Sequence, residues 1–500
     1  MSYLLNILVA VPLLATVAIL VGAPARATAV TSAVINLLLT LLALFQYDQA
    51  VGGFQFLSTI PVLPDWKLNL AFGADGLSLV LLLLTALVAA AAIWLAPKVE
   101  NREPLYYVGL LLITAGATGA FATTDLFFFY AFHELALIPT FLMIGIWGSG
   151  DRFTAAWKVT VYLAVGSMVL LVGLLALYLS IPADQRTFNI LELHHLAKAG
   201  VIPQIPWIYL TILIGFGILI SLFPFHTWAP LAYASAPAPT AMLHAGVLKK
   251  FGLYGLLRVA LPLLPEAAKP WANLLLILLV GNILYVGLVT IAQKKLDLTL
   301  GYSSVMHMGY IFLGLASMNV VGLSGAALLI FAHGLSVAVL FAIAGEIRQR
   351  TKTLDYAQLG GLGKPLPFLG YTFGMAAFAS IGLPGFGNFA SELLIFFGGF
   401  GDPSSSLLTH PKCCLGLSNI QWATVAALWG VVISAVYMLR AFRAVFQGET
   451  NKRWAELPDL RCCLKPAIIV LLGVLLFAGF RPQTFLNLIK PTVNSIVAAK

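Results

Sequence analysis

Residues 223–258, FPFHTWAPLAYASAPAPTAMLHAGVLKKFGLYGLLR, join a proline-rich start to an apolar run that contains His244, Lys249 and Lys250. The run from 237 to 260 is long enough to cross a bilayer. A charge at the centre of a membrane helix costs about 2.5–3.5 kcal/mol on insertion scales, so ionisable residues there are rare and usually functional. The stretch therefore predicts a membrane helix that borders a polar interior.

The whole chain has the composition of a membrane protein. Its 500 residues are 60% apolar and 9% charged, whereas soluble domains carry roughly 25% charged residues. We interpret residues 1–500 as a single integral membrane domain. The net charge of +9 does not indicate a nucleic-acid partner, because the basic residues are scattered between apolar segments. The first apolar segment lacks a basic start, so we expect a retained helix and not a cleaved signal.

Hydropathy predicts an all-α polytopic fold with about fourteen transmembrane helices. One longer connection, LPDWKLNLAFGADG, alternates weakly and predicts a short surface hairpin. The predicted crossings are 3–22, 29–47, 75–97, 105–122, 124–147, 155–180, 206–226, 237–260, 270–292, 301–318, 323–346, 366–400 (interrupted), 418–446 and 465–482.

Lysine and arginine are unequally divided between the two sides. Loops after odd-numbered crossings hold about 17 of them and the other side about 9, so the richer side is predicted to be cytoplasmic. Both termini are then predicted on the opposite, lumenal side.

Two crossings contain helix-breaking residues, in GFGILISLFPFHTWAP and in ASIGLPGFGNFASE. They are the seventh and twelfth, five crossings apart, so they run in opposite directions. Paired broken helices of opposite direction are typical of inverted-repeat transporters. The freed backbone groups need protein or water partners, so both breaks predict polar cavities.

The predicted crossings contain a set of ionisable residues that could pass protons along the membrane interior. Burial lowers the pKa of lysine and raises the pKa of glutamate, and a nearby opposite charge reverses both shifts. Lysine and glutamate side chains in such surroundings can therefore take up and release protons near neutral pH. The candidate relay residues are Glu134, Lys158, His244, Lys249, Lys250, His307, His333 and Glu392.

Several of these residues also have structural interpretations. Lys158 lies within a turn of its helix start and could extend to the interface. His307, early in its helix, and His333, between apolar flanks, could be polar packing residues, and Glu392 could cap the helix after its break. Glu134 has apolar neighbours for a turn on each side and fits a structural role least well.

No feature of the sequence predicts a metal or cofactor in this chain. The four cysteines form two adjacent pairs, Cys413–Cys414 and Cys462–Cys463, without the spacing of zinc, haem or iron–sulfur sites. One crossing separates the pairs, so no disulfide is expected between them. The glycine-rich GLPGFGNF lies inside a crossing and does not follow a strand, which disfavours a phosphate loop.

The motifs FPFHTWAPLAYASAPAPTAMLHAGVLKKFGLYGLLR, GYSSVMHMGY, AHGLSVAVLF and IGLPGFGNFASELLIFFG resemble the antiporter-like subunits of complex I, of the NuoM/NdhD type, from about residue 70 to 450. The resemblance implies two inverted five-helix repeats, placed here at about 105–260 and 270–446, with helices 7 and 12 broken. It also implies a proton-translocating subunit driven by quinone reduction elsewhere in the complex.

The resemblance assigns roles to individual residues. Glu134 matches the glutamate that gates the cytoplasmic half-channel, Lys158 the lysine of the sixth helix, Lys250 the central lysine of the eighth, His333 the histidine of the eleventh and Glu392 the acidic exit residue. His244 resembles a histidine of the sister subunits. Lys249 is additional, and it projects about 100° away from Lys250 on a helix.

Two positions depart from the family pattern. Leu219 stands where the seventh helix normally carries the lysine that pairs with the glutamate of the fifth. Either Lys249, Lys250 or His244 supplies that charge, or the pump of this subunit is modified or disabled. Asp297 stands in a segment that is more basic in most relatives. Both departures are similar to the cyanobacterial NdhD variants of the CO2-uptake complex.

The favoured hypothesis is therefore a membrane-arm subunit of a photosynthetic complex I, a ferredoxin- or NAD(P)H-dependent plastoquinone oxidoreductase and translocase. The expected partners are NdhF- and NdhB-type neighbours, lipids and, in the CO2-uptake form, a carbonic-anhydrase-like protein. Iron–sulfur clusters and plastoquinone are expected in the partner subunits, and the membrane would be the thylakoid. The alternatives are an Mrp-type cation/proton antiporter subunit and a structural paralogue with impaired pumping.

Overall fold

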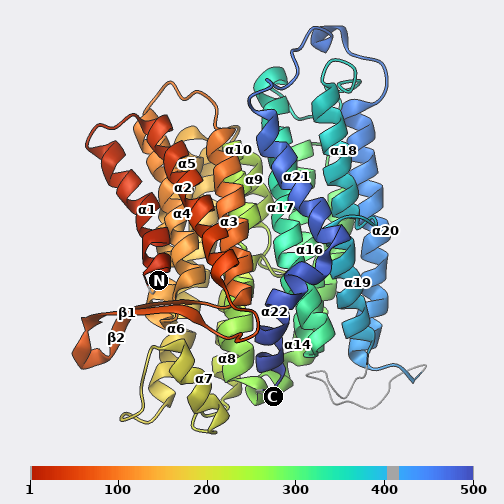
Figure 1. The fold of residues 1–500 in the computed structure, drawn as a ribbon. Helices are drawn as coiled ribbons and strands as arrows, with labels where there is room; N and C mark the ends of the chain where they lie inside the picture. The colour runs from red at the N-terminus through yellow and green to blue at the C-terminus, as the bar shows by residue number, and fades with distance from the viewer. Residues whose placement is uncertain (1–2, 402–415, 499–500) are drawn as a thin grey trace.

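The computed structural model describes residues 3–401 and 416–498, which form an upright bundle of helices with one small hairpin (Figure 1). Eight helices in these residues are long and apolar enough to cross a membrane. Three shorter apolar helices and one pair bent by 75° accompany them. The polytopic helical fold is thus confirmed. Fourteen crossings stay a prediction, because the other predicted crossings are short, divided or less apolar.

The helices are identified here by their bounds. Those that surround the candidate site are α5 (Leu126–Trp147), α6 (Arg152–Ser180), α8 (Pro206–Ile220), α9 (Trp228–Ser235), α10 (Ala238–Leu243), η2 (His244–Leu248), α11 (Lys250–Gly255), η3 (Leu256–Ala260), α16 (Leu296–Ser317), α17 (Val320–Thr351), α18 (Pro367–Ile381) and α19 (Gly387–Phe400). The others are α1 (Leu4–Leu20), α2 (Ala25–Gln46), α3 (Gly76–Trp94), α4 (Glu103–Ala122), α7 (Ile190–Lys198), α12 (Leu261–Leu263), α13 (Pro265–Ala268), η4 (Lys269–Trp271), α14 (Ala272–Val280), η5 (Gly281–Tyr285), α15 (Val286–Ile291), α20 (Asn419–Phe446), η8 (Lys452–Trp454), α21 (Lys465–Phe480) and α22 (Pro482–Val497).

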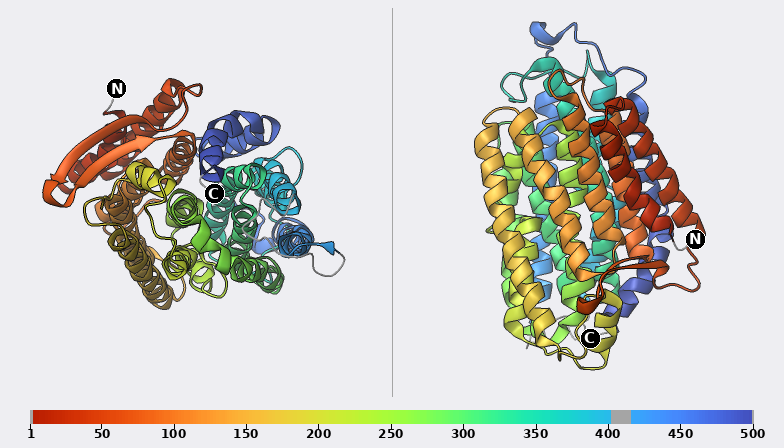
Figure 2. Two further views of the ribbon diagram at one scale, coloured as in Figure 1. Left: turned by 90° about the horizontal axis from the view of Figure 1, so that it is seen from below. Right: turned by 90° about the vertical axis from the view of Figure 1, so that its left-hand side faces the viewer.

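Helix α17 is the central element of the bundle. It is buried along its whole apolar length, whereas about two thirds of α2 remains uncovered. A helix that is apolar on all sides requires neighbours on all sides, and α17 packs against α16, α18 and α19 as well as α3 and α10. The view from below shows the helices of the second half of the chain, in green to blue, grouped together (Figure 2). His333 therefore lies in the middle of the protein.

The predicted break in the seventh crossing is present between α8 and α9. Helix α8 ends at Ile220, and Ser221 adopts a left-handed conformation with φ of 69°. Asn282 satisfies the freed backbone: its side-chain carbonyl accepts a hydrogen bond from the Phe223 amide at 2.6 Å, and its amide donates to the Ser221 carbonyl at 3.2 Å. Protein groups thus replace the lost helical bonds, as membrane depth requires.

The second predicted break separates α18 from α19. Gly382 and Gly385 have φ angles of +82° and +103°, which favour glycine. The Ser380 carbonyl, just before the break, receives a hydrogen bond from the imidazole of His307 at 2.8 Å. This break therefore places a backbone acceptor beside a predicted relay residue.

The eighth crossing, 237–260, contains two π-helical turns, η2 and η3. The sequence did not predict them. Lys249 and Lys250 lie between them, immediately after η2. Such turns are rare in helices and are frequent at functional sites, so this irregularity supports the importance of the two lysines.

The predicted hairpin is also present. Strands β1 (Gln55–Leu63) and β2 (Leu68–Ala74) pair in antiparallel fashion, with Thr59 opposite Ala71. The hairpin and α7 lie at the lower end of the bundle in Figure 1, which is also where the chain ends. The linker between α20 and α21 lies at the opposite end. Cys413 and Cys414 fall outside the described residues, and Cys462 and Cys463 are exposed free thiols.

Candidate functional site

Lys250 and His333 form a direct contact in the protein centre. The Nζ atom of Lys250, from α11, lies 2.7 Å from Nδ1 of His333, from α17. Lys250 is fully buried and His333 is 2% exposed. A proton can pass between hydrogen-bonded nitrogens, so the contact joins two of the predicted relay residues.

His307 extends this contact towards the second break. Its ring lies 5.5 Å from the ring of His333, measured between centroids. Its Nδ1 and Nε2 atoms lie 2.7 and 2.8 Å from the carbonyl oxygens of Ser303 and Ser380. Both ring nitrogens therefore lie beside backbone acceptors, and a neutral imidazole donates to only one of them at a time.

Lys249 points elsewhere, as the 100° separation predicts. Its ammonium lies 3.4 Å from the Ser304 carbonyl and 3.5 Å from the Ser304 hydroxyl. It also lies 5.7 Å from the centre of the Tyr233 ring, a cation–π arrangement. The two adjacent lysines thus contact different helices and cannot replace each other.

Glu134 does not contact either lysine in this structure. It accepts a hydrogen bond from the Ser167 hydroxyl, and one carboxylate oxygen lies 3.6 Å from Nδ1 of His133. About one third of its side chain is exposed, which is more than an interior relay residue would show. The glutamate therefore lies at the edge of the bundle, next to a histidine.

A small cavity lies between His133, the neighbour of Glu134 in the chain, and Lys249. It measures about 10 Å³ and is lined by His133, Leu137, Leu163, Leu219, His244, Leu248 and Lys249, which is space for about one water molecule. The Nδ1 atoms of His133 and His244 are buried without a hydrogen bond among the described residues. Buried polar atoms rarely lack partners, and both histidines line this cavity. Leu219 and Lys249 thus border the same space.

The remaining predicted residues lie near the two breaks. Lys158 is half-buried, with its ammonium 5.9 Å from the centre of the Tyr162 ring, and it forms no salt bridge with the described residues. Glu392 is 4% exposed, and its Oε1 atom has no hydrogen-bond partner among the described residues. A Cβ atom at Gly382 would collide with its other oxygen.

Other buried polar atoms near Glu392 also lack partners. Both side-chain polar atoms of Asn388 and the Tyr310 hydroxyl form no hydrogen bond with described residues. Asn388 is one helical turn before Glu392, on the same face of α19, and Tyr310 lies beside His307 with ring centroids 5.8 Å apart. Ordered water is the usual partner of such groups, so this region suits a hydrated segment between His307 and Glu392.

Sequence reasoning did not single out one buried charge cluster. Arg258, in η3, forms an ion pair with Asp75, the residue that caps α3. Each is at most 3% exposed. Both lie at or within predicted crossings, so the signal that identified the lysines was present here too.

Asp297 has an ion-pair partner in the structure. Its carboxylate binds the guanidinium of Arg348, which also donates a hydrogen bond to the Ser149 hydroxyl at 2.8 Å. This contact links α16 and α17 to the loop between α5 and α6. Within residues 3–401 and 416–498, no three His, Cys, Asp or Glu side chains gather as a metal site would require.

Comparison with known proteins gives a consistent result. A family model described as NADH:quinone oxidoreductase/Mrp antiporter, transmembrane, matches residues 123–410. NAD(P)H-quinone oxidoreductase chain 4-2 of Synechocystis sp. is 39% identical over 404 residues, which are 81% of this chain and 70% of that protein. NAD(P)H-quinone oxidoreductase chain 4 of Gloeobacter violaceus is 34% identical over 454 residues, 90% of this chain and 84% of that one.

Solved structures share the fold over nearly the whole chain. A chain of respiratory complex I from Thermus thermophilus superposes with a TM-score of 0.88 and 29% identity, covering 99% of both chains. A chain of the Mrp complex from Dietzia sp. superposes with a TM-score of 0.84 at 19% identity, covering 100% of this chain and 99% of the other. The second likeness concerns the fold alone.

Proposed function

The chain belongs to the NADH:quinone oxidoreductase/Mrp antiporter family, and from this we infer that it is a proton-translocating, antiporter-like subunit in the membrane arm of an NAD(P)H-quinone oxidoreductase. Quinone reduction takes place in other subunits of that enzyme. One observation supports the translocating role most directly: the buried contact between Lys250 and His333, with His307 beside it. These three ionisable side chains lie together in the apolar middle of the bundle, where apolar side chains would be expected to fill the space.

In the proposed path, protons reach the interior at Glu134 and leave near Glu392. Lys250, His333 and His307 carry them between these ends, and water near Asn388 completes the last segment. Lys158, beside the first break, tunes the field around the half-channel. The fourteen crossings and the two inverted repeats provide the symmetrical frame in which both breaks face this path.

Lys249 takes the role of the lysine that Leu219 replaces. It borders the same small cavity as Leu219, His133 and His244. A change in the charge of Glu134 can therefore act on the Lys249 ammonium through His133 and one water. His244 lies in the same wall and assists this step. The charge thus comes from the eighth helix in this chain and from the seventh in the family pattern.

The location and partners follow the same inference. The similarity to cyanobacterial proteins supports a thylakoid membrane, with the hairpin side and both termini in the lumen. NdhF- and NdhB-type subunits would be the neighbours, and Leu219 and Asp297 favour the form coupled to CO2 uptake through a carbonic-anhydrase-like partner. Plastoquinone and iron–sulfur clusters would lie in other subunits.

Charge relocation tests the role of Lys249. In the assembled complex, Lys249→Met is expected to lower the number of protons moved per electron, and adding Leu219→Lys is expected to restore it. Quinone reduction with an uncoupler present shows that each variant assembles. If Lys249→Met pumps like the parent, the assignment is wrong.

Purification of the tagged chain from gently solubilised membranes separates the candidate functions. Redox subunits should co-purify, and a CO2-hydrating protein would identify the subtype. Recovery of small antiporter subunits alone, with sodium-dependent proton exchange, would instead support the Mrp-type function that the shared fold allows.

A further inference from the structure

A second cavity lies outside the proposed path, on the face that carries the hairpin and α7. It measures about 360 Å³, and its rim includes the exposed residues His195, Lys198 and Ser495. Asp75 and Arg258 form its buried inner wall. Solvent from this face can therefore approach the eighth crossing as far as Arg258.

A dense hydrogen-bond network holds the inner wall. Asp75 accepts hydrogen bonds from the Ser78 amide at 3.0 Å and from the Thr492 hydroxyl, and it pairs with Arg258. Arg258 also donates through Nε to the Tyr254 hydroxyl at 3.3 Å. Helices α3, α22 and the eighth crossing are thus tied together at this point.

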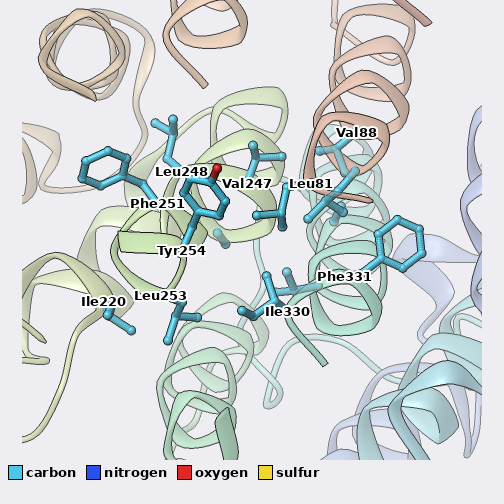
Figure 3. Close-up of a cluster of buried hydrophobic side chains, with 14 of the residues drawn as sticks. Leu81, Val88, Ile220, Val247, Leu248, Phe251, Leu253, Tyr254, Ile330 and Phe331 are labelled. Carbon is cyan, nitrogen blue, oxygen red and sulfur yellow. The ribbon is translucent and has the colours of Figure 1, made fainter. Parts of the chain in front are cut away.

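The same network leads towards the proposed path. Lys250, Tyr254 and Arg258 follow each other at intervals of four residues, which places them along one side of a helix. The Tyr254 hydroxyl lies 2.8 Å from the Ser78 hydroxyl, and Arg258 is about 12 Å from Lys250 along the axis. Apolar side chains such as Leu81 and Ile330 surround this stretch (Figure 3). The Tyr254 and Ser78 hydroxyls are therefore the polar groups that follow Arg258 on the side of the helix that leads to the central lysine.

Arg258 supplies the fixed positive charge at the inner end of the cavity. Burial, together with the nearby guanidinium, lowers the pKa of His194 to about 4, so this histidine is neutral near pH 6–7. Its Nε2 atom donates to the Arg258 carbonyl at 2.8 Å. The other ionisable groups facing the cavity are Asp75, already paired, and His195 and Lys198 at the rim. A fixed arginine at the inner end of a polar cavity repels protons and other cations.

We propose that Arg258, held by Asp75, is a barrier residue that prevents protons from returning through this cavity and Tyr254 to Lys250. The inference rests on the proposed function, because a leak matters only if Lys250 carries protons. It explains why a buried ion pair is kept at a site where two apolar residues would also pack. Arg258 takes no part in the transfer itself and acts by its charge.

Two matched variants test the barrier in the assembled complex. Asp75→Asn removes the carboxylate that pairs with Arg258 and keeps the Arg258 guanidinium, so the membrane is expected to stay impermeable to protons. Asp75→Asn combined with Arg258→Gln removes the charge and keeps a polar pair, so passive decay of an imposed proton gradient, with redox activity inhibited, is expected to speed up several-fold. Arg258→Gln alone is a third variant, and it is also expected to leak.

The controls separate this inference from the proposed function. Uncoupled quinone reduction reports assembly, and a purely structural role would lower it without creating a leak. Lys250→Met added to the leaking variant is expected to abolish the leak. If Lys250→Met lowers pumping but the proton gradient decays no faster in any assembled variant without the guanidinium, the barrier role of Arg258 is refuted and the proposed function stands. If Lys250→Met leaves pumping unchanged, the proposed function has failed first.

Discussion

Replacing Lys250 and His333 one at a time is expected to give unequal results. In Lys250→Met, an unbranched apolar side chain of similar length takes the place of a fully buried amine, and the energetic cost of burying that amine disappears. In His333→Leu, the amine remains and loses its 2.7 Å partner. It is the one hydrogen bond that Lys250 forms through its side chain with the described residues.

The sizes of the two effects follow from these contacts. An unsatisfied buried donor costs about 1–3 kcal/mol, and His333→Leu leaves the Lys250 amine in that state. Lys250→Met leaves only one imidazole nitrogen without its hydrogen bond, and it removes the larger cost of burying the amine. A loss of about 2 kcal/mol lowers Tm by about 2 °C in a chain of this length. We therefore expect His333→Leu to destabilise the complex measurably and Lys250→Met to change its Tm little, while both abolish the proton transfer that this subunit contributes.

The double variant provides the decisive measurement. Lys250→Met with His333→Leu should recover the Tm that His333→Leu alone loses, because no buried polar group is then left unpaired, and pumping should stay absent. The assays are thermal unfolding of the purified complex and protons moved per electron in proteoliposomes. Equal destabilisation by the two single variants, or no recovery in the double, would refute the reasoning.

Three further outcomes are expected. Gly382→Ala should impair pumping more than Gly385→Ala, since both have positive φ but only Gly382 adjoins Glu392; proton-to-electron ratios compare them. Because the folded-state pKa of His194 is lowered to about 4, its stabilising effect is present above about pH 6.5 and is lost as the pH falls towards 4; hydrogen exchange of α7 should rise over this window, and less so in His194→Asn. Asp297→Lys should lower the Tm more than Asp297→Asn, because it places a like charge beside the arginine that pairs with it.

The sequence was sufficient for features that local chemistry determines. Glycine and proline located both helix breaks, and charges within apolar runs identified Lys250 and His333. The different directions of Lys249 and Lys250 followed from helical geometry alone. The breaks and the directions of the lysines could be predicted because each depends on a few neighbouring residues, whereas the relay role of Lys250 and His333 stays a prediction.

Features that depend on distant contacts could not be predicted in this way. Asp75 and Arg258 are 183 positions apart in the chain, and no spacing rule joins them. The π-helical turns before and after Lys249 and Lys250 correspond to no spacing pattern in the sequence. The exposure of Glu134 likewise depends on which side of α5 faces out of the bundle.

Leu219 shows that the size of the cavity decides how many positive charges can line it. A lysine at this position would enter the small space that Lys249 already borders. Two like charges about 6 Å apart repel by about 3 kcal/mol at an effective dielectric constant of 20. One cation per cavity is therefore the stable arrangement, and in this chain Lys249 supplies it beside Leu219. Leu219→Lys should consequently be harmful in the parent chain and beneficial when Lys249 is methionine, a reversal of sign that loss of pumping in this subunit would not produce.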